Sequence, residues 1–175
     1  EPGVGVRGLA DVVFEKPVKV RGDGVHEVHI CAERGTVTGG VLSCDARLEG
    51  VDGTLHHRCR VLLGAHAQRS LWAPDTDWKA GPQKAEIYGR FFHGPSFQVL
   101  AGCELAAAAA RGTSEPLGPQ LGTDLPESFR AQAMARELAL QMAGVHSLFQ
   151  TSTFALPIGC RALRTWAHPT PGAVV

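Results

Sequence analysis

The pattern of apolar and polar residues predicts one long helix, which spans residues 127–149 in the last third of the chain. Strong helix formers dominate this stretch, which has no proline and contains one glycine, Gly144. Pro126 suits a first helical turn, and Asp124 or Ser128 offers a side chain that can cap nearby amides. Apolar residues cover more than one stripe, so we expect other elements to enclose this helix.

Residues 4–63 show the alternation of apolar and polar residues that is typical of β-strands. We interpret Gly35 as a turn, the pair Gly39–Gly40 as a bulge inside a strand, and Val51–Gly53 as the tight turn of a hairpin. The expected strands are 6–14, 25–33, 36–48 and 54–64. The first third of the chain is therefore predicted to be an antiparallel meander without a helix.

The chain changes character between residues 64 and 85. This segment is polar and is broken by Pro74, Gly81 and Pro82, so we expect a linker or a long surface loop. Beyond it, the Gly94-Pro95 pair predicts a sharp backbone feature within a cluster of aromatic residues. Further strands are expected at 96–105, within 106–126 and at 153–166.

Composition and charge exclude several classes of protein. The 175 residues carry no formal net charge and no basic run with interleaved aromatics, which argues against binding to nucleic acid. The five cysteines are scattered without a CxxC pair and predict neither a disulfide framework nor a zinc site. His56 and His57 are expected on opposite faces of a strand, where they cannot share a metal ion. No apolar run approaches the roughly 18 residues of a membrane span, and we expect a reducing, cytoplasmic location.

The two ends of the chain predict a fragment. The chain begins without methionine or a signal peptide, and it ends on GAVV, which resembles the beginning of a strand. We therefore expect that the chain is cut from a longer protein. Its length allows one ordinary domain or two small halves.

Glu137 and Gln141 interrupt the apolar part of the long helix. They are four residues apart, so they share a face of the helix. A carboxylate on a buried face is costly unless it is hydrogen-bonded or used in chemistry. Two structural interpretations stay open beside a functional one: a partly exposed polar stripe, or a Gln141 amide that merely satisfies Glu137.

The chain contains YGRFFHGPSFQ at residues 88–98 and ELALQ at residues 137–141. Both segments resemble motifs of the dehydratase domain of type I polyketide synthases and related polyunsaturated fatty acid synthases. Residues 88–98, YGRFFHGPSFQ, are similar to the aromatic Gly-Pro motif of that family, with His93 where tyrosine is commoner. Glu137-Leu-Ala-Leu-Gln141 is similar to the family's acid-x-x-x-Gln signature on a helix, with glutamate in place of the usual aspartate.

Two more segments agree with this family in order and in rough spacing. Residues 156–160, LPIGC, resemble the Leu-Pro motif after that helix, and residues 12–18, VVFEKPV, resemble a strand of the first half. The resemblance implies an α+β double hotdog, in which two antiparallel sheets each wrap around a long helix. Residues 1–63 would be the remainder of the first hotdog, 64–85 a linker, and 86–175 a second hotdog that lacks its C-terminal strands.

The resemblance implies an enzyme, a hydro-lyase that removes water from a 3-hydroxyacyl thioester and leaves the enoyl thioester. Glu137 would be the acid that protonates the leaving hydroxyl group, because an apolar pocket favours a protonated carboxyl group. Gln141, one helical turn later, would orient that carboxyl group by a hydrogen bond. The residues implied as substrate contacts are Tyr88, Phe92, His93, Gly94, Pro95, Phe97, Leu156 and Pro157.

Several of these residues keep a structural interpretation beside the functional one. Tyr88 is more often a packed aromatic residue with a hydrogen-bonded hydroxyl group than a catalyst. Phe92, Phe97 and Leu156 are expected in a core or in the wall of a substrate tunnel. For His93 a substrate contact is favoured over the role of catalytic base.

The complete histidine motif of the family is absent from the chain. In the family a histidine is followed four residues later by glycine and then by proline, and none of the eight histidines here has both. We therefore expect the isolated fragment to be inactive, because it lacks the catalytic base. Two alternatives stay open: an inactive pseudo-dehydratase that only shapes a megasynthase, and a hotdog domain with product-template or thioesterase chemistry.

The resemblance implies partners but no metal ion or cofactor of the domain itself. The substrate would be carried on the phosphopantetheine of an acyl carrier protein, in fatty acid or polyketide biosynthesis. The implied contacts are with that carrier protein and with neighbouring domains of a megasynthase, and a homodimer is allowed. Contacts with nucleic acid or with a membrane are not expected.

Overall fold

The computed structural model of the chain describes residues 5–19, 26–65, 77–114, 126–153 and 155–164. These residues divide into two compact units. Unit 1 holds the described residues up to 65 together with 157–164, and unit 2 holds 77–153 together with 155 and 156. The domain boundaries 1–63, 64–85 and 86–175 remain a prediction, and residues 66–76 of the expected linker lie outside the described residues.

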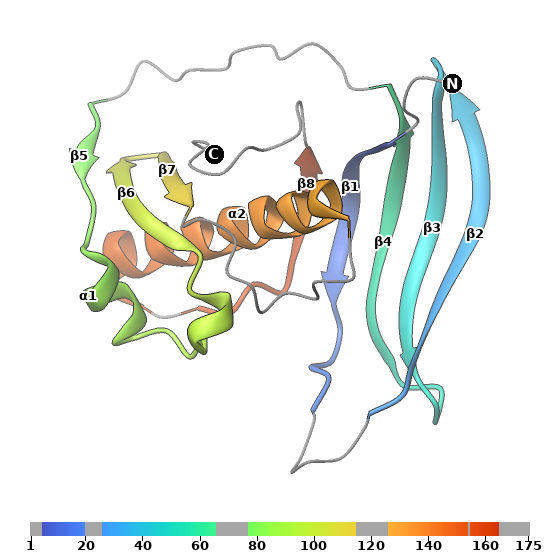
Figure 1. Cartoon of the computed structure of the whole chain (residues 1–175), viewed down its shortest axis with the longest axis horizontal. Coiled ribbons are helices and arrows are strands. Elements are labelled where there is room, and N and C mark those ends of the chain that lie inside the picture. Colours follow the sequence, from blue (N-terminus) through green and yellow to red (C-terminus); the bar gives the residue numbers. More distant parts are fainter. Residues whose placement is uncertain (1–4, 20–25, 66–76, 115–125, 154, 165–175) are drawn as a thin grey trace. The chain divides into compact units, whose positions relative to one another are not determined.

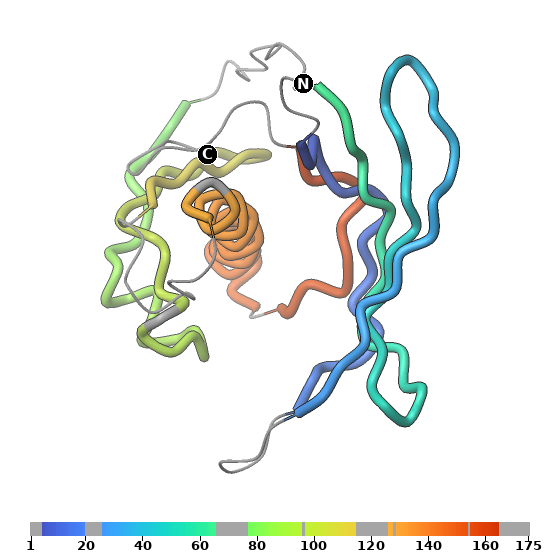
Figure 2. Tube along the Cα trace, turned by 45° about the vertical axis from the view of Figure 1, so that its right-hand side comes forward, coloured from blue at the N-terminus to red at the C-terminus, as the bar shows by residue number. Residues whose placement is uncertain are grey.

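Unit 1 is one antiparallel sheet of five strands (Figures 1 and 2). Its strands are β1 (Gly5–Phe14), β2 (Val28–Thr38), β3 (Val41–Gly50), β4 (Leu55–Gly64) and β8 (Gly159–Arg164), in the order β2-β3-β4-β1-β8. The expected antiparallel strands are confirmed, but a simple meander is wrong for β1. It pairs with β4 and β8 rather than with β2, so the strand order does not follow the chain.

The turns of this sheet correct one assignment and confirm another. Gly39 and Gly40, with φ angles of 56° and 75°, form the turn between β2 and β3, and not a bulge. Two adjacent positive φ angles suit a two-residue hairpin turn, which explains the glycine pair. Gly35 lies inside β2, where the register shifts between Arg34 and Val37, and is not a turn. The predicted turn at Val51–Gly53 is confirmed between β3 and β4.

Unit 2 combines a small antiparallel sheet with the long helix. The sheet has the order β5-β6-β7, from β5 (Lys79–Ala80), β6 (Leu100–Ala106) and β7 (Ala109–Ser114). The long helix α2 (Glu127–Thr151) confirms the predicted helix, and it packs on β7 and β6 (Figure 1). A short helix α1 (Lys84–Tyr88) and the 3-10 helix η1 (Pro95–Phe97) precede β6.

Three features of unit 2 differ from the sequence-based expectation. Strand β5 lies inside the segment that we interpreted as a linker or surface loop. The strand expected at 96–105 begins only at Leu100, because Pro95 starts the turn of 3-10 helix. Helix α1 was not expected, and it begins inside the segment interpreted as a linker. Its five residues are too few for a helical apolar period to be visible in the sequence.

The core of unit 2 lies between α2 and the elements that precede it in the chain. Its buried members are Ile87, Phe91, Val99, Leu100, Met134, Leu138, Met142, Val145 and Leu148. Five of them come from α2, and most other side chains of this helix are partly buried, as the broad apolar stripe predicts. Gly112 of β7 lies so close to α2 that an added Cβ would come 2.7 Å from Met142 Sδ. This close approach fixes how β7 lies on the helix.

The described residues also bear on membrane spans, metal sites and disulfide bonds. None of their helices is long and apolar enough to cross a membrane. They contain no group of three or more metal-ligating side chains that could hold an ion. The five cysteines, all of which are described, form no disulfide bond.

Truncating Leu138 tests the packing of α2. Leu138 is 0% exposed in the core of unit 2, whereas Leu156 is 60% exposed. We expect Leu138→Ala to lower the free energy of unfolding by about 2–5 kcal/mol, because it removes buried methyl groups and leaves a cavity. Leu156→Ala is the matched control and should change it by less than about 0.5 kcal/mol. Urea unfolding measures both, and equal effects would contradict the described core.

Candidate functional site

Glu137 and Gln141 lie on the face of α2 that borders the core of unit 2. Gln141 is 2% exposed, and the Glu137 side chain is 25% exposed. Gln141 Nε2 donates a hydrogen bond to Glu137 Oε1 at 2.7 Å. The spacing of four residues therefore brings the amide and the carboxylate together, as expected from the sequence. Glu137 sits at the edge of the buried region, where its carboxyl group keeps part of its exposure to solvent.

The amide of Gln141 also binds two segments that are far away in the sequence. Its Nε2 donates a second hydrogen bond to the carbonyl oxygen of Phe97 at 2.7 Å. Its Oε1 accepts a hydrogen bond from the hydroxyl group of Tyr88 at 2.7 Å. Both hydrogens of the Nε2 group are then used, and the oxygen has a donor, so the orientation of the amide is determined by its partners.

Tyr88 extends this network from α1 to the sheet. Its hydroxyl oxygen accepts a hydrogen bond from the backbone N–H of Leu100 at 2.8 Å, at the start of β6. Leu100 is 0% exposed, so its N–H has no access to water. The hydroxyl group of Tyr88 thus accepts from one buried donor and donates its own hydrogen bond to Gln141. This agrees with the structural interpretation of Tyr88 and gives it a place in the site.

The Gly-Pro motif presents the carbonyl group that Gln141 binds. Gly94 precedes η1, and its carbonyl oxygen accepts a hydrogen bond from the N–H of Phe97 at 2.9 Å. Pro95 suits the first position of this turn because it has no N–H to satisfy and a fixed φ angle. The motif therefore contacts Gln141 through a backbone carbonyl group. The side chain of Phe97 is 47% exposed.

His93 lies beside Glu137, with Nε2 3.3 Å from Oε1. Its side chain is 15% exposed, and its ring stacks on Phe92 with ring centroids 4.6 Å apart. The sequence marked His93 through the Gly-Pro motif, but it did not predict this contact. The histidine at position 93, where tyrosine is commoner, gained a meaning only when the structure placed its side chain beside that of Glu137.

Three other predicted site residues lie outside this network. Phe92 is 72% exposed beyond its stacking with His93. Leu156 is 60% exposed, and Pro157 is exposed in the other unit. Their assignment as substrate contacts stays a prediction.

Two of the described thiols, those of Cys103 and Cys160, are poor nucleophiles. Burial raises the pKa of the Cys103 thiol, and the nearby carboxylate of Glu104 raises it further. Burial also raises the pKa of the Cys160 thiol, although Cys160 is only partly buried. A raised pKa keeps both groups as thiols near neutral pH.

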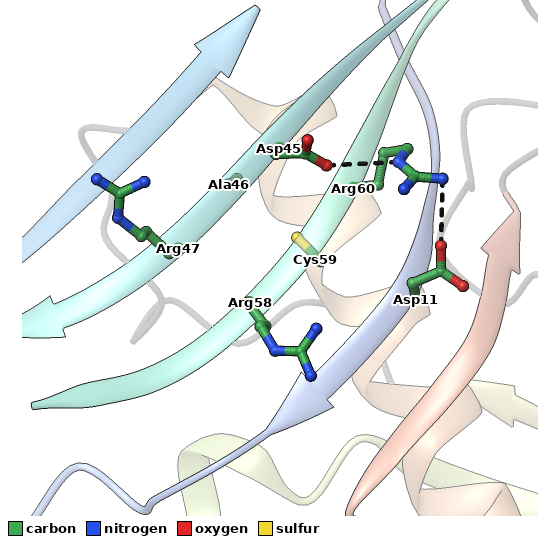
Figure 3. A pocket seen from close by; sticks show the side chains of 7 residues that line it. All are labelled: Asp11, Asp45, Ala46, Arg47, Arg58, Cys59 and Arg60. Carbon is green, nitrogen blue, oxygen red and sulfur yellow. Dashed lines mark hydrogen bonds and ion pairs between the residues drawn. The ribbon is translucent and has the colours of Figure 1, made fainter. Parts of the chain in front are cut away.

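A separate hollow of about 230 Å³ lies over β1, β3 and β4 of unit 1. Figure 3 shows Arg60 between Asp45 and Asp11, with contacts of 3.4 Å and 3.3 Å. The neighbouring cations are also paired, since Arg47 contacts Glu33 and Glu49, and Arg58 contacts Glu15. Exposed pairs of this kind contribute little stability, and the paired arginines do not form an anion site.

Known proteins match this chain in fold but not in sequence. No protein-family model matches the chain, and no curated protein matches its sequence. An inactive mutant of the CurK dehydratase matches with a TM-score of 0.67 at 16% identity, over 98% of this chain and 65% of its own. The fold is that of polyketide synthase dehydratase domains.

Two further dehydratase structures agree with this result. The dehydratase domain of RzxB from Pseudomonas fluorescens has a TM-score of 0.59 at 16% identity, over 90% of this chain and 59% of its own. A trans-AT polyketide synthase dehydratase domain from Brevibacillus brevis has a TM-score of 0.62 at 18% identity. The match covers 92% of this chain and 59% of that domain. The chain thus spans between 59% and 65% of these three domains. The predicted α+β hotdog architecture is confirmed.

The histidine pattern needs one refinement. His168 is followed four residues later by Gly172, but no proline follows Gly172 in this sequence. These two residues lie outside the described part of the chain. The candidate site among the described residues consists of Glu137, Gln141 and the residues that contact them, namely Tyr88, His93 and Phe97.

Removing the hydroxyl group of Tyr88 tests the network. Tyr88→Phe leaves the buried N–H of Leu100 and the amide oxygen of Gln141 without this partner. We expect the free energy of unfolding to fall by about 1–3 kcal/mol, the usual cost of unsatisfied buried polar groups. Ser43→Ala removes an exposed hydroxyl group that donates to Thr36 O at 3.3 Å, and should cost less than about 0.5 kcal/mol. A Tyr88→Phe protein as stable as the control would contradict the described bridge.

Proposed function

We propose that the chain is part of a polyketide synthase dehydratase, which removes water from a 3-hydroxyacyl thioester to give the enoyl thioester. The observation that carries this proposal is the carboxylate of Glu137, held by the buried amide of Gln141 on the long helix of a dehydratase-like fold. A carboxyl group that is fixed at the edge of an apolar core suits proton transfer to a leaving hydroxyl group.

The inactive mutants of the CurK dehydratase support the type of chemistry. One has phenylalanine in place of a histidine, and another has asparagine in place of an aspartate. An imidazole and a carboxyl group thus both matter in CurK. We assign the carboxyl role in this chain to Glu137, by its resemblance to the acid-x-x-x-Gln signature.

The proposed reaction uses Glu137 as the acid. A base removes a proton from the carbon next to the thioester carbonyl, and the electron pair forms the new double bond. The carbon–oxygen bond at the β-carbon breaks, and the hydroxyl group leaves as water with the proton of Glu137. Gln141 Nε2–H stabilises the negative charge that remains on Oε1. The proton taken by the base restores Glu137 for the next turnover, so the protons balance.

The proposal assigns the removal of the first proton to a histidine of the family motif. That motif is incomplete in this chain, and glutamate replaces the usual aspartate. These two departures favour a second candidate function, an inactive domain with a structural role in a megasynthase. In either case the proposed partners are an acyl carrier protein and neighbouring megasynthase domains.

The substitution Glu137→Gln tests the acid role in the intact protein. The substrate is a 3-hydroxyacyl group on an acyl carrier protein, and mass spectrometry follows the loss of water. We expect the rate of water loss to fall by about 10²–10⁴-fold, because an amide cannot supply the proton. Glu127→Gln is the matched control, since Glu127 is an exposed residue in the first turn of the same helix.

The other outcomes separate the alternatives. Water loss that continues unchanged in Glu137→Gln removes Glu137 from the mechanism. An unmodified 3-hydroxyacyl group after incubation with the wild-type protein supports the inactive structural domain. Release of a free acid instead of an enoyl thioester indicates thioesterase chemistry.

A further inference from the structure

His93 is held firmly beside Glu137, and the reaction proposed above gives it no role. Its Nε2 lies 3.3 Å from Glu137 Oε1, and the two side chains are 15% and 25% exposed. Phe92 stacks on the imidazole ring, and the ring of Phe91 lies with its centroid 5.5 Å away. Gln98 Nε2 donates a hydrogen bond to the carbonyl oxygen of His93 at 3.1 Å. Both the ring and the backbone of His93 are therefore restrained.

The two ring nitrogens of His93 have different surroundings. Nε2 faces the carboxylate, whereas Nδ1 is buried and has no hydrogen-bond partner among the described residues. A buried N–H without an acceptor is costly, so the proton of a neutral imidazole belongs on Nε2. The Nε2–H group then faces Glu137 Oε1 at 3.3 Å, and Nδ1 carries the lone pair.

Gln141 and His93 contact the same oxygen atom of Glu137. Gln141 Nε2 lies 2.7 Å from Oε1, and His93 Nε2 lies 3.3 Å from the same atom. The two donors come from different elements, one from α2 and one from the segment before η1. We propose that His93 is a positioning residue, which with Gln141 holds Oε1 and leaves Oε2 as the oxygen that transfers the proton.

This arrangement answers a specific problem of a glutamate in this position. The side chain of glutamate has one more rotatable bond than that of aspartate, so a single hydrogen bond leaves its carboxyl group free to swing. A second donor from another element limits that motion and fixes the direction of Oε2. Small errors in the position of a reacting group slow a reaction strongly, so restraint of this kind raises the rate.

The same geometry argues against His93 as the base that removes the first proton. Its Nε2 is occupied by Glu137, and its Nδ1 is buried. Neither nitrogen is open to a substrate carbon in this structure. His93 therefore acts through Glu137.

Two substitutions in the intact protein separate positioning from packing. His93→Gln keeps an N–H donor close to Oε1, whereas His93→Phe fills the space without a donor. We expect His93→Phe to lower kcat for water loss by about 10–100-fold with little change in KM, and His93→Gln to stay within about threefold of wild type. His146→Phe is the control, because it removes another partly buried imidazole, which contacts Ala106 O at 3.0 Å. It should leave kcat unchanged.

The kinetic result can overturn the proposal in two ways. If His93→Phe and His93→Gln lower kcat equally, the effect comes from packing and not from the N–H donor. If neither substitution lowers kcat in an active protein, His93 does not position Glu137.

A second measurement does not need activity. The rate effect rests on the proposed function, but the pairing of His93 with Glu137 is a property of the folded chain. Selective ¹⁵N labelling of histidine in the intact protein, with His93→Gln to assign the signal, reports which ring nitrogen carries the proton. The titratable groups in contact with His93 among the described residues are Glu137 and Tyr88, whose ring centroid is 6.4 Å from that of His93.

The expected spectrum shows His93 protonated on Nε2, with signals that shift in Glu137→Gln. Protonation of the neutral ring on Nδ1, or signals that do not respond to Glu137→Gln, would overturn the proposal. A protein that shows the expected pairing but releases no water would contradict the proposed function alone. The two failures are therefore distinguishable.

Discussion

The buried amide of Gln141 is the interaction on which the rest of the candidate site depends. It donates to Glu137 on α2 and to the Phe97 carbonyl of η1, and it accepts from Tyr88 of α1. Through the hydroxyl group of Tyr88 the same network reaches the N–H of Leu100 in β6. A buried amide must satisfy its donors and its acceptor, and a network with every member satisfied specifies one arrangement. One hydrogen-bond network thus connects four elements of unit 2, three of them directly at the Gln141 side chain.

The apolar core and this polar network make different contributions to unit 2. Leu138, Met142 and Val145 are buried next to the polar pair and fix how α2 lies against β6 and β7. Such contacts are strong but tolerate small shifts, whereas hydrogen bonds of 2.7 Å require a definite direction. The core therefore supplies stability, and the network supplies the position of the Glu137 carboxyl group. A site that is built on a helix in this way keeps its geometry better than one on a loop.

The sequence was informative where local periodicity decides the structure. The contact of Glu137 with Gln141 follows from a spacing of four on a strongly helical segment, and the resemblance to dehydratases rests on the same residues. The bridge from Tyr88 to Leu100, 12 residues away, depends on how α1 packs, and no periodic pattern signals it. The roles of Gly35 and of Gly39–Gly40 were exchanged for a related reason. A glycine in a strand pattern marks either a turn or a bulge, and cross-strand register decides which.

The most direct test of this account is the dehydration rate of Gln141→Leu in the intact protein, with its stability measured in parallel. Leucine has a similar volume but removes the donor to Glu137 and both other hydrogen bonds of the amide. The account predicts that kcat for water loss falls by about 10²-fold in a protein that is still folded, while KM changes little. A folded Gln141→Leu protein with an unchanged kcat would contradict the claim that this amide sets the position of the reacting carboxyl group.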